Sequence, residues 1–189
     1  MLRKFLRKIL PNPLDRMLKK ANTKKILLGW NRGMGDIALG LFAIVKRIKE
    51  KIPDAEITFI IRKDLKEGFA FFEGVETIIA PDWKRGEEYC VKKTLKSLNL
   101  DSKEFDLIIE KPDPTYWVSW QRGRVVPKLK WNPLWENLYE KFKLERGFFY
   151  IGVQPECETG YGGFRDWNSW QKLFNLLDKK RVRVLLFGK

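Results

Sequence analysis

The chain has 189 residues, which is enough for one domain of ordinary size or for one domain and part of a second. Hydrophobic residues make up 44% and aromatic residues 14%, so a folded globular protein is favoured over a disordered one. The net charge of +14 favours anionic partners, whereas the absence of histidine excludes a His general base, a Ser-His pair and a His-ligated metal.

The N-terminal segment holds most of the charge. Residues 1–25 contain nine basic residues and one acidic residue, Asp15. Apolar residues recur at helical spacing in "MLRKFLRKIL", and after two prolines the pattern resumes in "LDRMLKK". Residues 1–20 therefore predict a broken, basic amphipathic helix that lies on an anionic membrane surface. The alternative is a helix that packs its apolar stripe against the protein body and leaves its charges in solvent.

From residue 24 onward, strand and helix patterns alternate. Short apolar runs predict strands at residues 24–30, 55–62, 75–80 and 105–110, and the second of these is rich in β-branched and aromatic residues. Helical patterns at residues 36–52, 63–72 and 86–100 separate them. This alternation indicates an α/β fold with a Rossmann-like parallel sheet.

An irregular, aromatic and basic stretch follows at residues 111–135, and a further helix is predicted around "LWENLYEKFKL". The stretch contains Trp117, Trp120, Trp131 and Trp135 together with Arg122, Arg124, Lys128 and Lys130. It could bind a phosphorylated sugar, a lipid headgroup or a single-stranded nucleic acid. In the alternative interpretation, its tryptophans are buried in the core and its basic residues form a solvated face. A second strand–helix–strand pattern then runs from residue 147 to residue 189.

The turn "GWNRGMGD" lies where the first strand passes into the first helix. It matches neither the Walker phosphate loop nor the dinucleotide-binding spacing of glycines. Gly33 and Gly35 would permit a positive φ or a close approach of a ligand. Asp36 is placed to cap the helix, and it also lies at the carboxyl end of a strand, where parallel sheets bind ligands. Position alone is compatible with two roles for Asp36, a helix cap and a catalytic carboxylate.

The segment "KKILLGWNRGMGDIALGLFAIVKRIKEKIPDAEITFIIR" resembles the start of the heptosyltransferase-type glycosyltransferases of lipopolysaccharide core assembly. The later segment "YIGVQPECETGYGGFRDWNSWQKLF" is similar to the opening of that family's second domain, although an Asp-Trp-Asn follows Arg165 where the family has Trp-Pro after its basic residue. The resemblance implies a GT-B arrangement, in which two Rossmann-like domains face each other. Residues 1–23 would be the basic segment, 24–146 the acceptor-side domain and 147–189 the incomplete beginning of the nucleotide-sugar domain.

The resemblance also implies roles for individual residues. Asp36 would deprotonate the acceptor hydroxyl, with Arg32, Gly33, Met34 and Gly35 forming the acceptor loop. Arg165, Gln154 and Thr159 would bind the phosphates of the donor. No metal and no cofactor is expected, and the donor substrate would be a nucleotide-diphosphate sugar such as ADP-heptose.

The expected function is therefore an inverting, metal-independent sugar transfer to a lipopolysaccharide-core or other lipid-linked, anionic glycan. The alternatives are a non-catalytic module that binds an anionic membrane or a partner protein, and a basic nucleic-acid-binding protein. The sequence shows no signal peptide and no apolar run long enough to span a membrane, and its two cysteines have no metal-ligand spacing. We therefore expect a cytoplasmic protein that is peripheral on the inner membrane.

Overall fold

The computed structural model describes residues 12–19, 24–114, 117, 128–154 and 169–187. The chain divides into two compact units between Pro133 and Leu134, and each unit is described here by itself. The expected boundary was thirteen residues later, at residue 147. The difference arises because residues 134–146 contact the second unit: the Phe142 ring meets the Phe187 ring at 5.6 Å, and the Glu145 amide donates to the Tyr150 hydroxyl at 2.8 Å.

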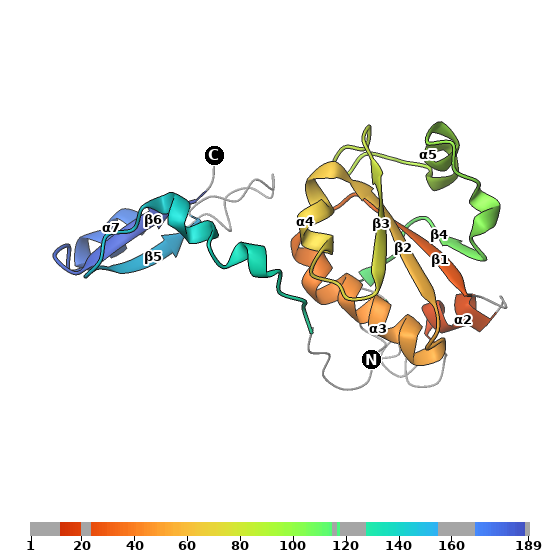
Figure 1. Ribbon diagram of the computed structural model, residues 1–189, viewed down its shortest axis with the longest axis horizontal. Helices are drawn as coiled ribbons and strands as arrows, with labels where there is room; N and C mark the ends of the chain where they lie inside the picture. The colour runs from red at the N-terminus through yellow and green to blue at the C-terminus, as the bar shows by residue number, and fades with distance from the viewer. Residues whose placement is uncertain (1–11, 20–23, 115–116, 118–127, 155–168, 188–189) are drawn as a thin grey trace. The chain divides into compact units, whose positions relative to one another are not determined.

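The first unit is built on a four-stranded parallel sheet in the order β3-β2-β1-β4 (Figure 1). Its strands are β1 (Lys25–Trp30), β2 (Glu56–Arg62), β3 (Val75–Ala80) and β4 (Leu107–Ile109). β1 pairs with β2 over six residues, from Lys25↔Glu56 to Trp30↔Ile61, but with β4 over only three, the last pair being Leu28↔Ile109. The predicted parallel α/β sheet is thus confirmed for this unit.

Alternate strand residues point to opposite faces of the sheet, and helices cover both faces. Ile26, Leu28 and Trp30 join the larger core, beneath α3 (Phe42–Lys51) and α4 (Lys66–Phe69). Leu27 joins a smaller core with the residues of α5 (Val91–Ser97). Figure 1 shows α3 and α4 on one side of the sheet and α5 on the other. Short 3₁₀ turns occupy η2 (Lys63–Leu65) and η3 (Ser102–Glu104).

The helix α2 (Pro13–Lys19) is part of the larger core. The side chain of Asn12 caps it, since its Oδ1 accepts from the Leu14 amide at 2.9 Å. Leu14 and Leu18 are 1% and 5% exposed, and the Asp15 carboxylate forms a two-pronged ion pair with Arg47 of α3 at 2.6 and 2.9 Å. Residues 12–19 therefore follow the second of the two predictions: the apolar side of the helix packs against the protein body. The membrane prediction for residues 1–11 lies outside the described residues.

The second unit contains two parallel strands, β5 (Phe149–Val153) and β6 (Val182–Leu186), and the helix α7 (Trp170–Leu176). The helix predicted around residues 134–144 is instead a pair of 3₁₀ turns, η4 (Pro133–Trp135) and η5 (Leu138–Phe142). Among the described residues of this unit only Val153 is a buried hydrophobic residue, whereas Phe149, Leu176 and Leu186 are 69%, 83% and 65% exposed. The described residues of this unit thus cover neither face of the small sheet as fully as parallel sheets require.

Candidate active site at the carboxyl edge of the sheet

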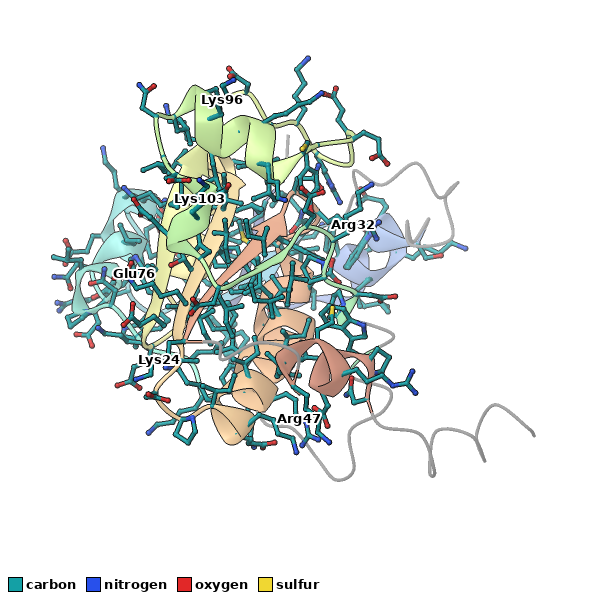
Figure 2. The ribbon with its side chains drawn as sticks, turned by 90° about the vertical axis from the view of Figure 1, so that its right-hand side faces the viewer. Lys24, Arg32, Arg47, Glu76, Lys96 and Lys103 are labelled. Atoms are coloured by element: carbon teal, nitrogen blue, oxygen red, sulfur yellow. The ribbon has the colours of Figure 1, made fainter. Side chains whose placement is uncertain are left out.

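The carboxyl ends of the four strands in the first unit meet at one edge of the sheet. In the order 3-2-1-4, the chain direction of the connections reverses between β1 and β4, and open α/β sheets bind ligands at such a point. Three segments come together there: residues 31–36 after β1, residues 81–90 after β3, and residues 110–113 after β4. In Figure 2, Arg32 marks this edge and Lys24, just before β1, marks the opposite edge.

Asn31 fixes the segment after β1 to the segment after β3. Its side chain is buried, and its amide nitrogen donates to the backbone oxygens of Lys84 at 3.2 Å and Glu87 at 2.6 Å. The Gly86 amide in turn donates to the backbone oxygen of Asn31 at 3.3 Å. Because both neighbours of the side chain are carbonyl oxygens, the amide group has only one orientation that satisfies them. These contacts fasten the loop after β1 to the loop after β3.

Tyr89 separates the ends of β1 and β4. Its hydroxyl lies 2.5 Å from the Glu110 carbonyl oxygen and 3.1 Å from the Gly29 carbonyl oxygen, at the position where the next backbone pairing would fall. The ring packs against Trp83 with centroids 4.1 Å apart. A Cβ at Gly29 would lie 2.7 Å from the Glu110 oxygen and 2.8 Å from the Tyr89 ring, so only glycine fits there. Burial raises the pKa of Tyr89 to about 12, with the nearby Arg32 charge opposing that rise.

A hollow of about 280 Å³ opens between the ends of β1 and β4, and we call it the switch-point pocket. Its walls come from all three segments. The lining residues are Trp30, Asn31, Arg32, Gly86, Glu87, Glu88, Tyr89, Lys111, Pro112 and Asp113. The Lys111 ammonium lies 2.5 Å from the Glu88 carboxylate, and this contact lowers the pKa of Glu88. The pocket is therefore polar and contains both signs of charge.

Asp36 lies at the far end of the loop after β1, exposed to solvent. The helical backbone begins at Gly35, so Asp36 stands inside the first turn and not at the capping residue before it. Within the described part of the chain its carboxylate accepts no hydrogen bond, and the predicted capping role is therefore not what the structure shows. A carboxylate in this position is open to a substrate.

The turn directly after Asp36 is a π-helix, η1 (Ile37–Leu41), which then continues as α3. Single π turns inside helices occur frequently at functional sites, because the wider turn re-aims the side chains beside it. The turn packs closely against the segment after β4: a Cβ on Gly40 would lie 2.5 Å from the Pro114 Cβ. The segment after β4, which forms one wall of the pocket, thus also packs against the helical turn that follows Asp36.

The other predicted loop residues have different surroundings. A Cβ on Gly33 would lie 3.5 Å from the Asp36 Oδ2 and 3.8 Å from the Arg85 Nη2, so a carboxylate and a guanidinium approach the same point above the loop. Gly35 has open space around it, and neither Gly33 nor Gly35 has a positive φ. Arg32 lines the pocket, whereas the side chain of Met34 lies near Gly68 in α4. The loop therefore brings Arg32 and Asp36 to the edge and directs Met34 elsewhere.

Arg62, the last residue of β2, supports the loop from beneath. It is 8% exposed, and its Nη2 lies 3.4 Å from the Arg32 backbone oxygen and 2.9 Å from the Asp64 carboxylate. Its Nε is buried without a hydrogen-bond partner among the residues the structure describes. Arg62 thus links the end of β2 to the loop after β1 through the Arg32 backbone oxygen.

The predicted donor-binding residues belong to the second unit. Gln154 follows β5 directly and is exposed, as expected for a residue at the carboxyl end of a strand. Arg165 and Thr159 lie outside the described residues. In the aromatic and basic stretch, Trp117 is 8% exposed and belongs to the larger core, whereas Trp131 is 58% exposed. Trp120, Arg122 and Arg124 also lie outside the described residues.

Two residues of the candidate site, Asn31 and Tyr89, are not indicated as site residues by the sequence pattern. Asn31 stands within a Gly-rich turn, and the signal that points to its role is that an asparagine directly after a buried strand can fix a loop through its side chain. Tyr89 was assigned to a helix that was expected over residues 86–100 and begins only at Val91. Nothing in the local pattern indicates its contact with Gly29, because the two residues lie sixty positions apart.

A larger hollow of about 680 Å³ lies at the opposite, amino-terminal edge of the sheet. Its lining includes Lys25, Glu56, Glu76 and Lys130. We favour the smaller pocket as the site, since parallel α/β sheets bind ligands at the carboxyl ends of their strands.

In the part of the chain that the structure describes, no group of three or more Cys, Asp or Glu side chains could hold a metal ion. Over the same residues, no helix has the length and apolar character needed to cross a membrane. No protein-family model, curated protein or solved structure matches this chain.

Proposed function

We propose that this chain is the acceptor-side part of an inverting glycosyltransferase that uses a nucleotide-diphosphate sugar as donor. The first donor to test is ADP-heptose. The observation that supports the proposal most strongly is the exposed Asp36 carboxylate, held at the carboxyl edge of a Rossmann-like sheet beside the Arg85 guanidinium. The acceptor would be a lipopolysaccharide-core or other lipid-linked glycan.

In this mechanism Asp36 removes the proton from an acceptor hydroxyl as that oxygen attacks the anomeric carbon of the donor sugar. The bond from the anomeric carbon to the nucleotide diphosphate breaks at the same time, and the nucleotide diphosphate leaves with its electron pair. A single displacement of this kind inverts the configuration at the anomeric carbon. The cations Arg165 and Arg85 would offset negative charge on the leaving diphosphate and on the acceptor, respectively.

The test is a screen of nucleotide-diphosphate sugars with a lipopolysaccharide-core acceptor, followed by measurement of the anomeric configuration of the product. We expect release of the nucleotide diphosphate that depends on the acceptor, and a product of inverted configuration. A product of retained configuration would contradict the single-displacement mechanism.

A second candidate, a non-catalytic module that docks on a partner protein, is favoured by the second unit. Its described residues include Leu134, Leu176 and Leu186 with exposed fractions of 80%, 83% and 65%. Exposed apolar side chains gathered on so small a unit are typical of a surface that another protein covers. Self-association or partner binding that persists without any sugar transfer in the screen would support this candidate.

A further inference from the structure

The larger hollow, at the amino-terminal edge of the sheet in the first unit, differs in charge from the chain that contains it. We call it the amino-edge hollow. The chain has a net charge of +14, yet acidic residues outnumber basic ones in the lining. The acidic residues are Asp54, Glu56, Glu73, Glu76 and Glu104, and the basic ones are Lys25, Lys49 and Lys130. An acidic hollow on a basic protein concentrates cations at that one place.

Four of these carboxylates have no partner among the residues that the structure describes. Asp54 is paired with Lys24 at 3.1 Å, and the charge of Lys49 also acts on it. The four glutamates of the lining, in contrast, take part in no ion pair and accept no hydrogen bond within the described ranges. If Lys25 and Lys130 are each set against one glutamate, two negative charges of the lining are left without compensation.

A buried hydroxyl group of the lining is also without a partner. Thr58 of β2 lines the hollow and is only 8% exposed, and its hydroxyl makes no hydrogen bond to the described part of the chain. Its oxygen is not among the side-chain atoms that are fully buried without a partner, so solvent in the hollow reaches it. Buried polar groups of native proteins are nearly always hydrogen-bonded, to the protein, to water or to a ligand. The Thr58 hydroxyl therefore marks a position where a bound group is hydrogen-bonded.

Glu56 and Glu76 lie on the same face of the sheet as Thr58. Glu56 precedes Thr58 by two residues on β2, which places the two about 7 Å apart along the strand. Glu76 is the residue of β3 that pairs with Thr58 (Figure 2). Two carboxylates and a hydroxyl oxygen thus surround one point as hydrogen-bond acceptors. An ammonium group, which has three donors and no acceptor, matches this arrangement.

The rest of the lining suits a ligand in which methylene groups separate several positive charges. Glu73 and Glu104 add carboxylates at other points, and Ile78, Leu100 and Phe105 add apolar surface between them. The described carboxylates form no group of three that could hold a metal ion, so their charges suit separate cationic groups. The hollow of about 680 Å³ is within the usual size range of small-molecule sites.

We propose that the amino-edge hollow binds an aliphatic polyamine, with one ammonium group at Thr58, Glu56 and Glu76 and a second one at Glu73 or Glu104. The site lies at the opposite edge of the sheet from Asp36, and the inference does not rest on the proposed sugar transfer.

A lysine-rich peptide that added a strand to β3 would be another source of ammonium groups, because β3 is an edge strand of the described sheet. The position of Thr58 favours the polyamine. Thr58 belongs to β2, one strand inward from that edge, whereas an added strand would pair with β3 itself.

The experiment is a calorimetric titration of the full-length protein with spermidine at low ionic strength. We expect one equivalent of spermidine to bind, at least about tenfold more tightly than n-butylamine, which brings a single charge. The affinity should fall as salt is added. A ¹⁵N NMR titration should show the shifted amide signals at Thr58 and Glu76. Neither titration contains a sugar nucleotide, so their outcome is independent of the transfer assay.

Variants of the lining test which groups hold the ligand. Changing Glu56→Gln and Glu76→Gln together should weaken spermidine binding by about 3–30-fold. Thr58→Val keeps the shape of the side chain and removes the hydroxyl, and it should weaken binding by about tenfold. Glu67→Gln, the same change at an exposed carboxylate of α4 outside the hollow, should leave the affinity as it is. Melting temperatures show that each variant is folded.

Several results would overturn the inference. They are the absence of spermidine binding, equally tight binding of n-butylamine, and an affinity that does not change in the double glutamate variant. An oligolysine peptide that binds and shifts the amides of β3, when spermidine does not bind, would replace the polyamine site by an edge-strand interface.

Discussion

The hydroxyl of Tyr89 takes the place of a backbone pairing between β1 and β4. It lies 2.5 Å from the Glu110 oxygen and 3.1 Å from the Gly29 oxygen, beyond the last paired residues of the two strands. Replacing it by phenylalanine leaves those carbonyl groups without their partner. We expect Tyr89→Phe to lower the free energy of unfolding by about 1–3 kcal/mol, measured by chemical denaturation at neutral pH.

The same residue gives a pH dependence whose sign can be stated. Burial raises the pKa of Tyr89 to about 12, whereas tyrosine in an unfolded chain ionises near pH 10. The contribution of the neutral phenol to stability is therefore complete below about pH 10 and is lost as the pH rises toward 12. A spectroscopic titration should show one late phenol that is absent from Tyr89→Phe. A late phenol that remains in the variant would assign the shift to another tyrosine.

Of the three glycines in "GWNRGMGD", the first is the one that the packing requires. A Cβ on Gly29 would meet the Glu110 oxygen at 2.7 Å, whereas a Cβ on Gly35 meets nothing within 4 Å. We expect Gly29→Ala to destabilise the fold by about 1–3 kcal/mol through overpacking. Gly35→Ala, in a helical turn with open space, should be neutral or stabilise by up to about 1 kcal/mol. Equal melting temperatures for the two variants would contradict this assignment.

At the scale of elements, α2 is a structural helix whose apolar side chains belong to the core. We expect Leu14→Ala to cost about 2–5 kcal/mol, because Leu14 is 1% exposed and packs within the larger core. The exposed neighbour Arg16, changed to alanine, should alter stability by no more than about 0.5 kcal/mol. Thermal unfolding of the two variants checks the difference. If Leu14→Ala were as stable as Arg16→Ala, the packing of α2 in the core would be contradicted and the membrane-surface interpretation would be favoured.

The strands of the first unit could be predicted because each is a short apolar run that adjoins a helical pattern. The strand expected at residues 75–80 has those bounds in the structure, since Pro81 stops it. The helices were predicted less well. The expected helix 86–100 begins only at Val91, because residues 86–90 instead make long-range contacts with Asn31 and Gly29.

The candidate site could be predicted only where it follows from the position of one strand. The place of Asp36 at this edge follows from the buried strand before it, because parallel sheets present such residues at one edge. Arg32 was named only through the family resemblance, and the roles of both residues stay predictions. The pocket could not be found in this way, because its lining residues come from three loops that are far apart in the sequence. The π turn after Asp36 was also not predictable, since "IALGL" has an ordinary helical pattern.

At the scale of the whole molecule, the two units differ in how much core each contains. The buried hydrophobic residues of the described chain fall almost entirely within the first unit, and Val153 is the exception. We expect residues 1–133 alone to unfold in one cooperative transition close to that of the full chain, because the core is intact there. Residues 134–189 alone should show no cooperative transition. Calorimetry on the two fragments measures both outcomes, and a cooperative second unit would contradict the description of its sheet as incompletely covered.

The central claim is that Asp36 is the general base of a sugar transfer, and the most direct test is the turnover of Asp36→Asn. With a nucleotide-diphosphate sugar that the unchanged protein uses, kcat should fall by about 10²–10⁴-fold while the melting temperature stays the same, since the side chain is exposed. The matched variant Asp82→Asn, at an exposed carboxylate after β3, should retain full turnover. Unchanged turnover in Asp36→Asn would contradict the account.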